Sequence, residues 1–132
     1  MNRSAMRELA FKAIYGMEVQ KEYSKEQLDL FIEDNDVKDD GAIEYITSVF
    51  EGIEKNEKEI LELISSNLKR DWTIDRISKV NVAILKIAIF EIKFNELPFK
   101  VVINEAVELA KKYGDEAAPL FVNGVLGSIV NQ

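Results

Sequence analysis

Hydrophobic side chains recur every three to four positions along almost the whole chain, which is the repeat of an amphipathic α-helix. Polar connections of about two to eight residues separate these segments, as in a compact helical bundle. No segment alternates in the way that predicts a β-strand. The predicted helices cover residues 3–19, about 25–33, a third segment from Ile43 to Ile53, a fourth from Ile60 to Leu68, about 74–94, 102–113 and 119–130.

Residues at the ends of these segments predict where the helices start and stop. Ser24 and Asn56 are each followed three residues later by Gln or Glu, which is the capping-box pattern of a helix start. Thr73 is a suitable N-cap for the long helix at about 74–94, and Pro119 fits the first turn of the last helix. Gly114 predicts a left-handed stop after the helix that ends at residue 113.

The segment at about 74–94 has hydrophobic residues around most of its circumference, so we expect it to be the central helix. With 132 residues, the chain corresponds to one domain, or to two small subdomains that share a core. The pattern as a whole therefore predicts an all-α protein of about seven helices in one compact helical domain.

Composition removes most enzyme classes from consideration. The chain has no Cys and no His, which excludes disulfides, thiolate metal sites, a Cys nucleophile and the usual general base near neutral pH. Neither GxGxxG nor a P-loop occurs, and the EF-hand register that places Gly41 at loop position 6 puts Lys38 at a ligand position. We therefore predict a protein without catalytic activity, cofactor or metal.

Targeting features are also missing from the sequence. No stretch reaches the roughly 18 hydrophobic residues that a membrane-spanning helix needs, and charged residues interrupt the N-terminal segment before a signal peptide could form. We therefore expect a cytoplasmic protein with no membrane association.

Charge is distributed unevenly along the chain, although the total is −7. Residues 22–45 carry nine acidic and two basic side chains, whereas residues 69–112 carry nine basic and six acidic ones. Glu91 and Glu105 stand among hydrophobic residues, so we expect buried carboxylates that pair with a backbone N–H or a lysine. The asymmetry is typical of separate acidic and basic surfaces, although solvated helix faces would give the same pattern.

The basic residues form the sharpest local pattern. Arg3 and Arg7 are four residues apart, so they share one flank of the first helix. On the central helix, four basic residues lie within roughly 100° of one another, and an aromatic residue lies among them. They are Arg76, Lys79, Lys86 and Lys93, with Phe90. Such a stripe suits a phosphate backbone with a stacked base, and a lysine-coated solvent face is the alternative.

Two longer motifs carry a family resemblance. The run from Ile103 to Lys111 reads INEAVELAK, and the run from Phe121 to Leu126 reads FVNGVL. Together with the first helix, AMRELAFKAIY from Ala5, and the loop Asp36–Asp39, they resemble the NusB family of transcription antitermination factors over nearly the whole chain.

The resemblance implies an all-α fold of two small helical subdomains packed together, at about residues 1–70 and 71–132. It implies a non-enzymatic protein that binds the single-stranded boxA element of nascent ribosomal RNA transcripts. Members of the family do so together with NusE, a small-subunit ribosomal protein, within the RNA polymerase antitermination complex. No small-molecule substrate is implied. A basic partner of this kind suits the acidic third and fourth helices, at about 41–68.

The expected RNA-binding residues combine the basic stripe with positions that match the family. Arg3 and Arg7 match its N-terminal arginine-rich segment, although Ser4 and Ala5 stand where arginine is common in the family. Tyr113 and Phe121 match aromatic residues near the family's RNA surface. The complete set is Arg3, Arg7, Lys79, Lys86, Tyr113 and Phe121.

Two other functions remain open from the sequence. A similar helical domain begins certain ribosomal RNA cytosine methyltransferases, so the chain could be a fragment of such an enzyme. Alternatively, the protein could be a helical scaffold that binds only other proteins.

Overall fold

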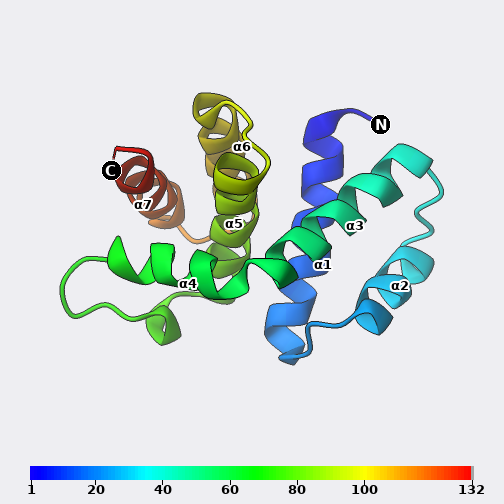
Figure 1. The fold of residues 1–132 in the computed structure, drawn as a ribbon, viewed down its shortest axis with the longest axis horizontal. Coiled ribbons are helices and arrows are strands. Elements are labelled where there is room, and N and C mark those ends of the chain that lie inside the picture. Colours follow the sequence, from blue (N-terminus) through cyan, green and yellow to red (C-terminus); the bar gives the residue numbers. More distant parts are fainter. Residues whose placement is uncertain (132) are drawn as a thin grey trace.

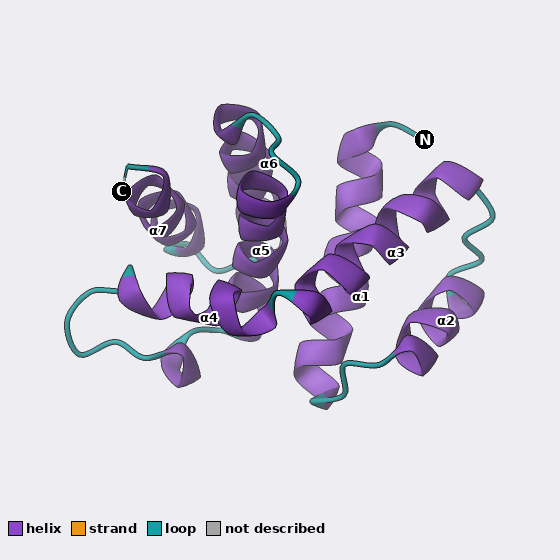
Figure 2. Cartoon of the chain, viewed as in Figure 1, coloured by secondary structure: helices purple, strands orange, loops and turns teal. Residues whose placement is uncertain are grey.

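The computed structural model describes residues 1–131, and α-helices make up most of them (Figures 1 and 2). The α-helices are α1 (Arg3–Gln20), α2 (Lys25–Asp34), α3 (Asp40–Lys55), α4 (Glu57–Ser66), α5 (Lys79–Ile89), α6 (Phe99–Tyr113) and α7 (Ala118–Val130). A short 3-10 helix, Ile74–Arg76, precedes α5, and a π-helical turn, Phe90–Phe94, follows it. No strand occurs within residues 1–131, so the prediction of an all-α protein with about seven helices is confirmed.

The helices form two groups that meet along α1 and α5. Figure 1 shows α1, α2 and α3 on one side, α5, α6 and α7 on the other, and α4 running below. α1 packs against both α3 and α5, and α6 packs against both α5 and α7. One hydrophobic cluster includes buried side chains from both groups. The boundary between two subdomains near residue 70 therefore stays a prediction.

α5 is the central helix, as its composition predicts. Every side chain from Val82 to Ile89 is buried, and α1, α4, α6 and α7 all contact the helix. The helix α5 starts at a later residue than we predicted. Ser78, not Thr73, caps the helix, because the Ser78 Oγ accepts the backbone N–H of Asn81 at 3.1 Å. Thr73 makes no side-chain cap and stands before the 3-10 turn.

Two of the other predicted helix ends are confirmed and one is wrong. The Ser24 Oγ accepts the backbone N–H of Gln27 at 3.2 Å, and Pro119 lies in the first turn of α7. Asn56 does not cap α4 with its side chain. Its amide instead donates to the carbonyl of Gly52 at 2.8 Å, so this residue finishes α3.

Two glycines are required by close packing. Gly114 ends α6 with an extended backbone (φ −92°, ψ 179°), so the predicted left-handed stop is wrong. A Cβ there would lie 2.5 Å from the Cβ of Ala118. In α3, a Cβ on Gly52 would lie 1.9 Å from the ring of Phe90, so this glycine allows the start of the π-helical turn to pack against α3.

Within residues 1–131, none of the helices combines the length and the hydrophobicity that crossing a membrane requires.

Candidate nucleic-acid interface

Arg7, one of the expected RNA-binding residues, is buried at the junction of α1 with the C-terminal helices. Its side chain donates from Nε to Glu91 Oε1 at 2.9 Å and from Nη1 to Glu105 Oε1 at 3.4 Å. The hydroxyl of Tyr45 donates to the other oxygen of Glu91 at 3.1 Å. Arg7 is 3% exposed and Glu91 is 1% exposed, so both charges are removed from water. Glu91 is therefore buried as expected, whereas Glu105 keeps 23% of its side chain exposed. The cation that both carboxylates share is an arginine, not the lysine or backbone N–H that we expected.

Neighbouring carboxylates keep the buried guanidinium of Arg7 in its charged form. Burial disfavours a charged guanidinium, but the hydrogen bond and charge of Glu91 outweigh that penalty and raise the pKa of Arg7. The pKa of Tyr45 is raised by burial and then by the neighbouring Glu91, so its hydroxyl stays a donor. Arg7 thus acts as the central cation of a buried cluster that joins α1, α3, the π-helical turn and α6.

A second polar contact links α1 with the end of α6. Glu8 accepts a hydrogen bond from the hydroxyl of Tyr113 at 2.6 Å and pairs with the ammonium of Lys112 at 2.5 Å. These two partners lower the pKa of Glu8, while burial and the bond to Glu8 raise the pKa of Tyr113. The ring of Tyr113 packs on Phe11 with centroids 4.9 Å apart. Tyr113 is therefore occupied by contacts within the protein.

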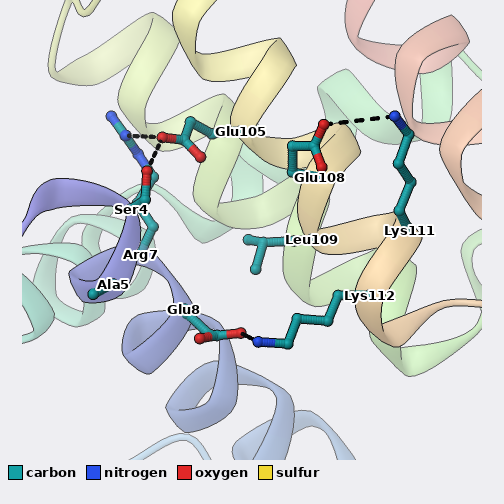
Figure 3. A pocket seen from close by; sticks show the side chains of 9 residues that line it. All are labelled: Ser4, Ala5, Arg7, Glu8, Glu105, Glu108, Leu109, Lys111 and Lys112. Atoms are coloured by element: carbon teal, nitrogen blue, oxygen red, sulfur yellow. Dashed lines mark hydrogen bonds and ion pairs between the residues drawn. The ribbon is translucent and has the colours of Figure 1, made fainter.

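These contacts line a groove between α1 and α6, which we call the α1–α6 seam (Figure 3). It has a volume of about 510 Å³ and is lined by Ser4, Ala5, Arg7, Glu8, Glu105, Glu108, Leu109, Lys111 and Lys112. Three carboxylates lie along it, and Figure 3 shows Ser4 and Arg7 pointing toward Glu105. Lys111 lies 3.5 Å from Glu108. Each cation of the seam thus faces a carboxylate.

The basic stripe predicted on the central helix does not form one exposed face. Lys86 is 5% exposed and pairs with Glu18 of α1, and Phe90 belongs to the core. The expectation of a continuous solvent-facing stripe is therefore wrong, because its middle packs between α1 and the rest of the core. Lys79 and Lys93 are exposed at the two ends.

Phe121 lies in a different place, together with residues that the sequence did not single out. A groove of about 520 Å³ runs between α7 and the segment that follows α4, and we call it the Trp72–Phe121 groove. Asn67, Lys69, Trp72, Leu120, Phe121, Gly124, Val125 and Ser128 line it. Trp72 is 51% exposed and Leu120 is 81% exposed. A tryptophan in a charged connection between two helices could have identified this groove.

The six expected residues therefore do not meet at one site. Arg7 and Tyr113 belong to the α1–α6 seam and its rim, Lys86 lies inside the α1–α5 contact, and Phe121 lines the second groove. Arg3 is exposed at the start of α1, and Lys79 at the start of α5. RNA binding by these residues stays a prediction. Among residues 1–131, no group of acidic side chains is arranged to hold a metal ion.

Comparisons of the sequence with a family model and with known relatives indicate the same family. A sequence model described as the NusB family matches residues 4–131. The transcription antitermination protein NusB of Acetivibrio thermocellus is 44% identical over 131 residues, which cover 98% of this chain and 89% of that protein. NusB of Clostridium perfringens is 45% identical over 131 residues, covering 98% of this chain and 96% of the relative.

Solved structures share the whole fold. NusB of T. maritima matches with a TM-score of 0.88 and 33% identity, covering 100% of this chain and 92% of the other. A structure described as antitermination factors NusB and NusE in complex with dsRNA contains a chain with a TM-score of 0.88 and 30% identity. That match covers 98% of this chain and 96% of the other. The protein therefore belongs to the NusB family.

Proposed function

We propose that the protein is a transcription antitermination factor that binds single-stranded boxA RNA of ribosomal RNA transcripts together with NusE. The observation that carries this proposal is the family match over residues 4–131, with relatives of 44% and 45% identity that are antitermination proteins. The solved NusB–NusE–dsRNA complex, which has the same fold, supports RNA and NusE as the partners. The RNA polymerase antitermination complex is the setting in which both would act.

The role needs no catalytic chemistry. The chain lacks His and Cys, and its most buried carboxylate, Glu91, is held by Arg7 and Tyr45 as part of the core. We assign the protein a binding function in the cytoplasm and no enzymatic activity. The methyltransferase alternative has no support among the relatives described above, all of which are NusB proteins.

Burial and pairing with carboxylates of the chain together divide the six expected RNA-binding residues into two groups with different tasks. Arg3, Lys79 and Phe121 have surface available for a phosphate or a base. Arg7, Lys86 and Tyr113 are held by carboxylates of this chain, so their task is to keep α1 in place against α5 and α6. An RNA phosphate could replace Glu91 at Arg7 only by leaving that buried acid without its cation, which is costly.

The acidic surface of α3 and α4 suits NusE, if that partner is as basic as ribosomal proteins generally are. Five exposed glutamates lie on these two helices: Glu44, Glu51, Glu54, Glu59 and Glu62. A basic protein docked there would reduce the long-range repulsion between RNA and a chain of net charge −7. RNA and NusE should then each increase the affinity for the other by the same factor.

The test is a titration of labelled boxA RNA with the purified protein at fixed salt, with and without saturating NusE. We expect binding that becomes tighter when NusE is present, and weaker binding of a scrambled RNA of the same length. Absence of boxA binding in both titrations would show that the proposed function is wrong. Equal affinities in the two titrations would show that RNA and NusE bind independently.

A further inference from the structure

We propose that the Trp72–Phe121 groove is a subsite for an unstacked RNA base, with the ammonium of Lys69 beside the adjoining phosphate. This inference rests on the proposed function, and it adds Trp72 and Lys69 to the RNA-binding surface. It also places the base-binding surface away from Tyr113 and the α1–α6 seam.

The walls of the groove are held in place by local hydrogen bonds. The Ser128 hydroxyl of α7 donates to Asn67 Oδ1 at 2.6 Å, which ties α7 to the end of α4. A tight turn follows, in which the backbone N–H of Trp72 donates to the carbonyl of Lys69 at 3.0 Å. Asp71, inside this turn, has φ of +71°, a conformation that non-glycine residues adopt at an energetic cost. The turn places the indole of Trp72 at the surface of the groove, where half of it meets solvent.

The groove offers the chemistry that a nucleobase needs. Indole and phenyl rings line it together with the apolar side chains of Leu120 and Val125, and these surfaces suit the flat face of a base. Its volume of about 520 Å³ lies in the usual range for small-ligand sites, so a single base and part of its ribose fit.

Charge around the groove favours RNA over an acidic or purely hydrophobic ligand. Of the described residues that line it, Lys69 is charged and none is acidic. In the connection, Arg70 and Arg76 are exposed together with Asp71 and Asp75, and Lys79 is exposed at the start of α5, so the segment keeps an excess of basic residues. A single-stranded RNA needs phosphate-binding cations beside an aromatic platform, and this segment supplies both. In the α1–α6 seam, the three cations already face three carboxylates of the chain, so the seam attracts the same phosphates less.

The chain provides its own probe, because Trp72 is its single tryptophan. Stacking of a base on the indole should quench the tryptophan fluorescence when boxA RNA is added, and the quenching should saturate together with binding measured by labelled RNA. An RNA of the same length with abasic positions keeps the phosphates, so it should bind more weakly and quench less.

Substitutions at the groove give an independent measurement. Trp72→Ala should weaken boxA binding by roughly fivefold to a hundredfold, the range for loss of one stacked base, and Trp72→Phe should restore part of it. Lys69→Gln should reduce the slope of log affinity against log salt by about 0.7. Val101→Ala, at a residue 52% exposed on α6 and outside the groove, is the matched control and should leave binding unchanged. Melting curves confirm that each variant is folded.

Three results would overturn the proposal. If boxA RNA binds without changing tryptophan fluorescence and Trp72→Ala binds as the wild type does, the proposed function stands but this subsite is wrong. If NusE alone quenches the fluorescence and RNA does not, the groove is a protein-docking surface. If dilution of the protein alone changes the fluorescence, a second copy of the chain occupies the groove.

Discussion

The α1–α6 seam and the Trp72–Phe121 groove have almost the same volume, about 510 and 520 Å³, yet they differ in the state of their charges. In the seam, Arg7, Lys111 and Lys112 each face a carboxylate of the same chain. In the groove, Lys69 is charged and none of the other described lining residues is acidic. The seam has more basic residues, but the groove has the stronger attraction for an anion. Counting basic residues is thus a poor guide to an RNA surface when their partners are unknown.

The two regions also contribute differently to folding and binding. The seam joins helices far apart in sequence, and its buried Arg7 stabilises the fold and is unavailable to a ligand, whereas Lys111 and Lys112 at its rim stay exposed. The groove leaves Trp72 and Leu120 exposed, so these side chains contribute little to the core. Substitutions in the seam should therefore change the free energy of unfolding, and substitutions around the groove should change RNA affinity.

The largest expected effect is on stability and comes from Arg7→Met. This change leaves the buried carboxylate of Glu91 without its cation, and loss of one partner of a buried ion pair costs about 3–5 kcal/mol. Urea denaturation measures the difference. Lys69→Met is the matched control at the groove and should change the unfolding free energy by less than about 0.5 kcal/mol. Equal stability of the two variants would contradict the distinction between the regions.

A smaller effect is expected from the aromatic residues. Tyr113→Leu removes the ring contact with Phe11 and the hydrogen bond to Glu8, which together should cost about 1–2 kcal/mol. Trp72→Leu should cost less, because half of that side chain is already in water. Urea denaturation curves of both variants, recorded under the same conditions, test which substitution lowers the free energy of unfolding more. A larger loss for Trp72→Leu would place Trp72 in the structural core.

The salt dependence of RNA binding distinguishes basic residues that are exposed from basic residues that are paired with a carboxylate of the chain. Arg3→Gln and Lys79→Gln should each reduce the slope of log RNA affinity against log salt by about 0.7, the contribution of one phosphate contact to a single strand. Lys86→Gln should leave that slope unchanged while lowering the melting temperature, because Lys86 is paired with Glu18. A changed slope in Lys86→Gln would show that its ammonium contacts RNA.

The smallest effect concerns pH and the exposed part of the seam. Lys112 and Tyr113 lower the pKa of Glu8, so the contact stabilises the protein above the ordinary glutamate pKa and is lost as pH falls through the lowered value. The stability difference between wild type and Glu8→Gln should be below about 1 kcal/mol at neutral pH, since the pair is partly exposed. The difference should shrink as the pH falls below the ordinary glutamate pKa and through the lowered pKa of Glu8. If the stability difference between wild type and Glu8→Gln grew on acidification, the prediction that the Glu8 contact is lost in acid would be wrong.

Much of the fold could be predicted from the sequence because helical periodicity and caps are local properties. Ser24 and Pro119 act where their neighbours indicate, and the hydrophobic segment around Ile84 is central. The start of α5 could not be predicted, because both Thr73 and Ser78 are suitable caps and hydrophobic residues continue the helical period between them. Which of these two residues caps α5 depends on how the helix packs in the folded protein.

The candidate site was harder to predict because it depends on partners distant in sequence. The spacing of Arg3 and Arg7 correctly places both on one flank of α1, but only the structure shows that Glu91, 84 residues away, accepts the Arg7 guanidinium. Lys86 is likewise paired with Glu18, 68 residues away. Trp72 is the opposite case, since its exposure follows from a local turn.

The long sequence separation between Arg7 and Glu91 has a consequence for synthesis on the ribosome. The 84 residues that follow Arg7, up to and including Glu91, take roughly 4–17 s to translate at about 5–20 residues per second. During that interval the apolar face of α1, with Phe11 and Ile14, can be covered only by the early helices α2 and α3. α1 therefore gains its contact with α5 only after that interval, and a chain that stalls before α5 leaves part of this face open to chaperones and proteases.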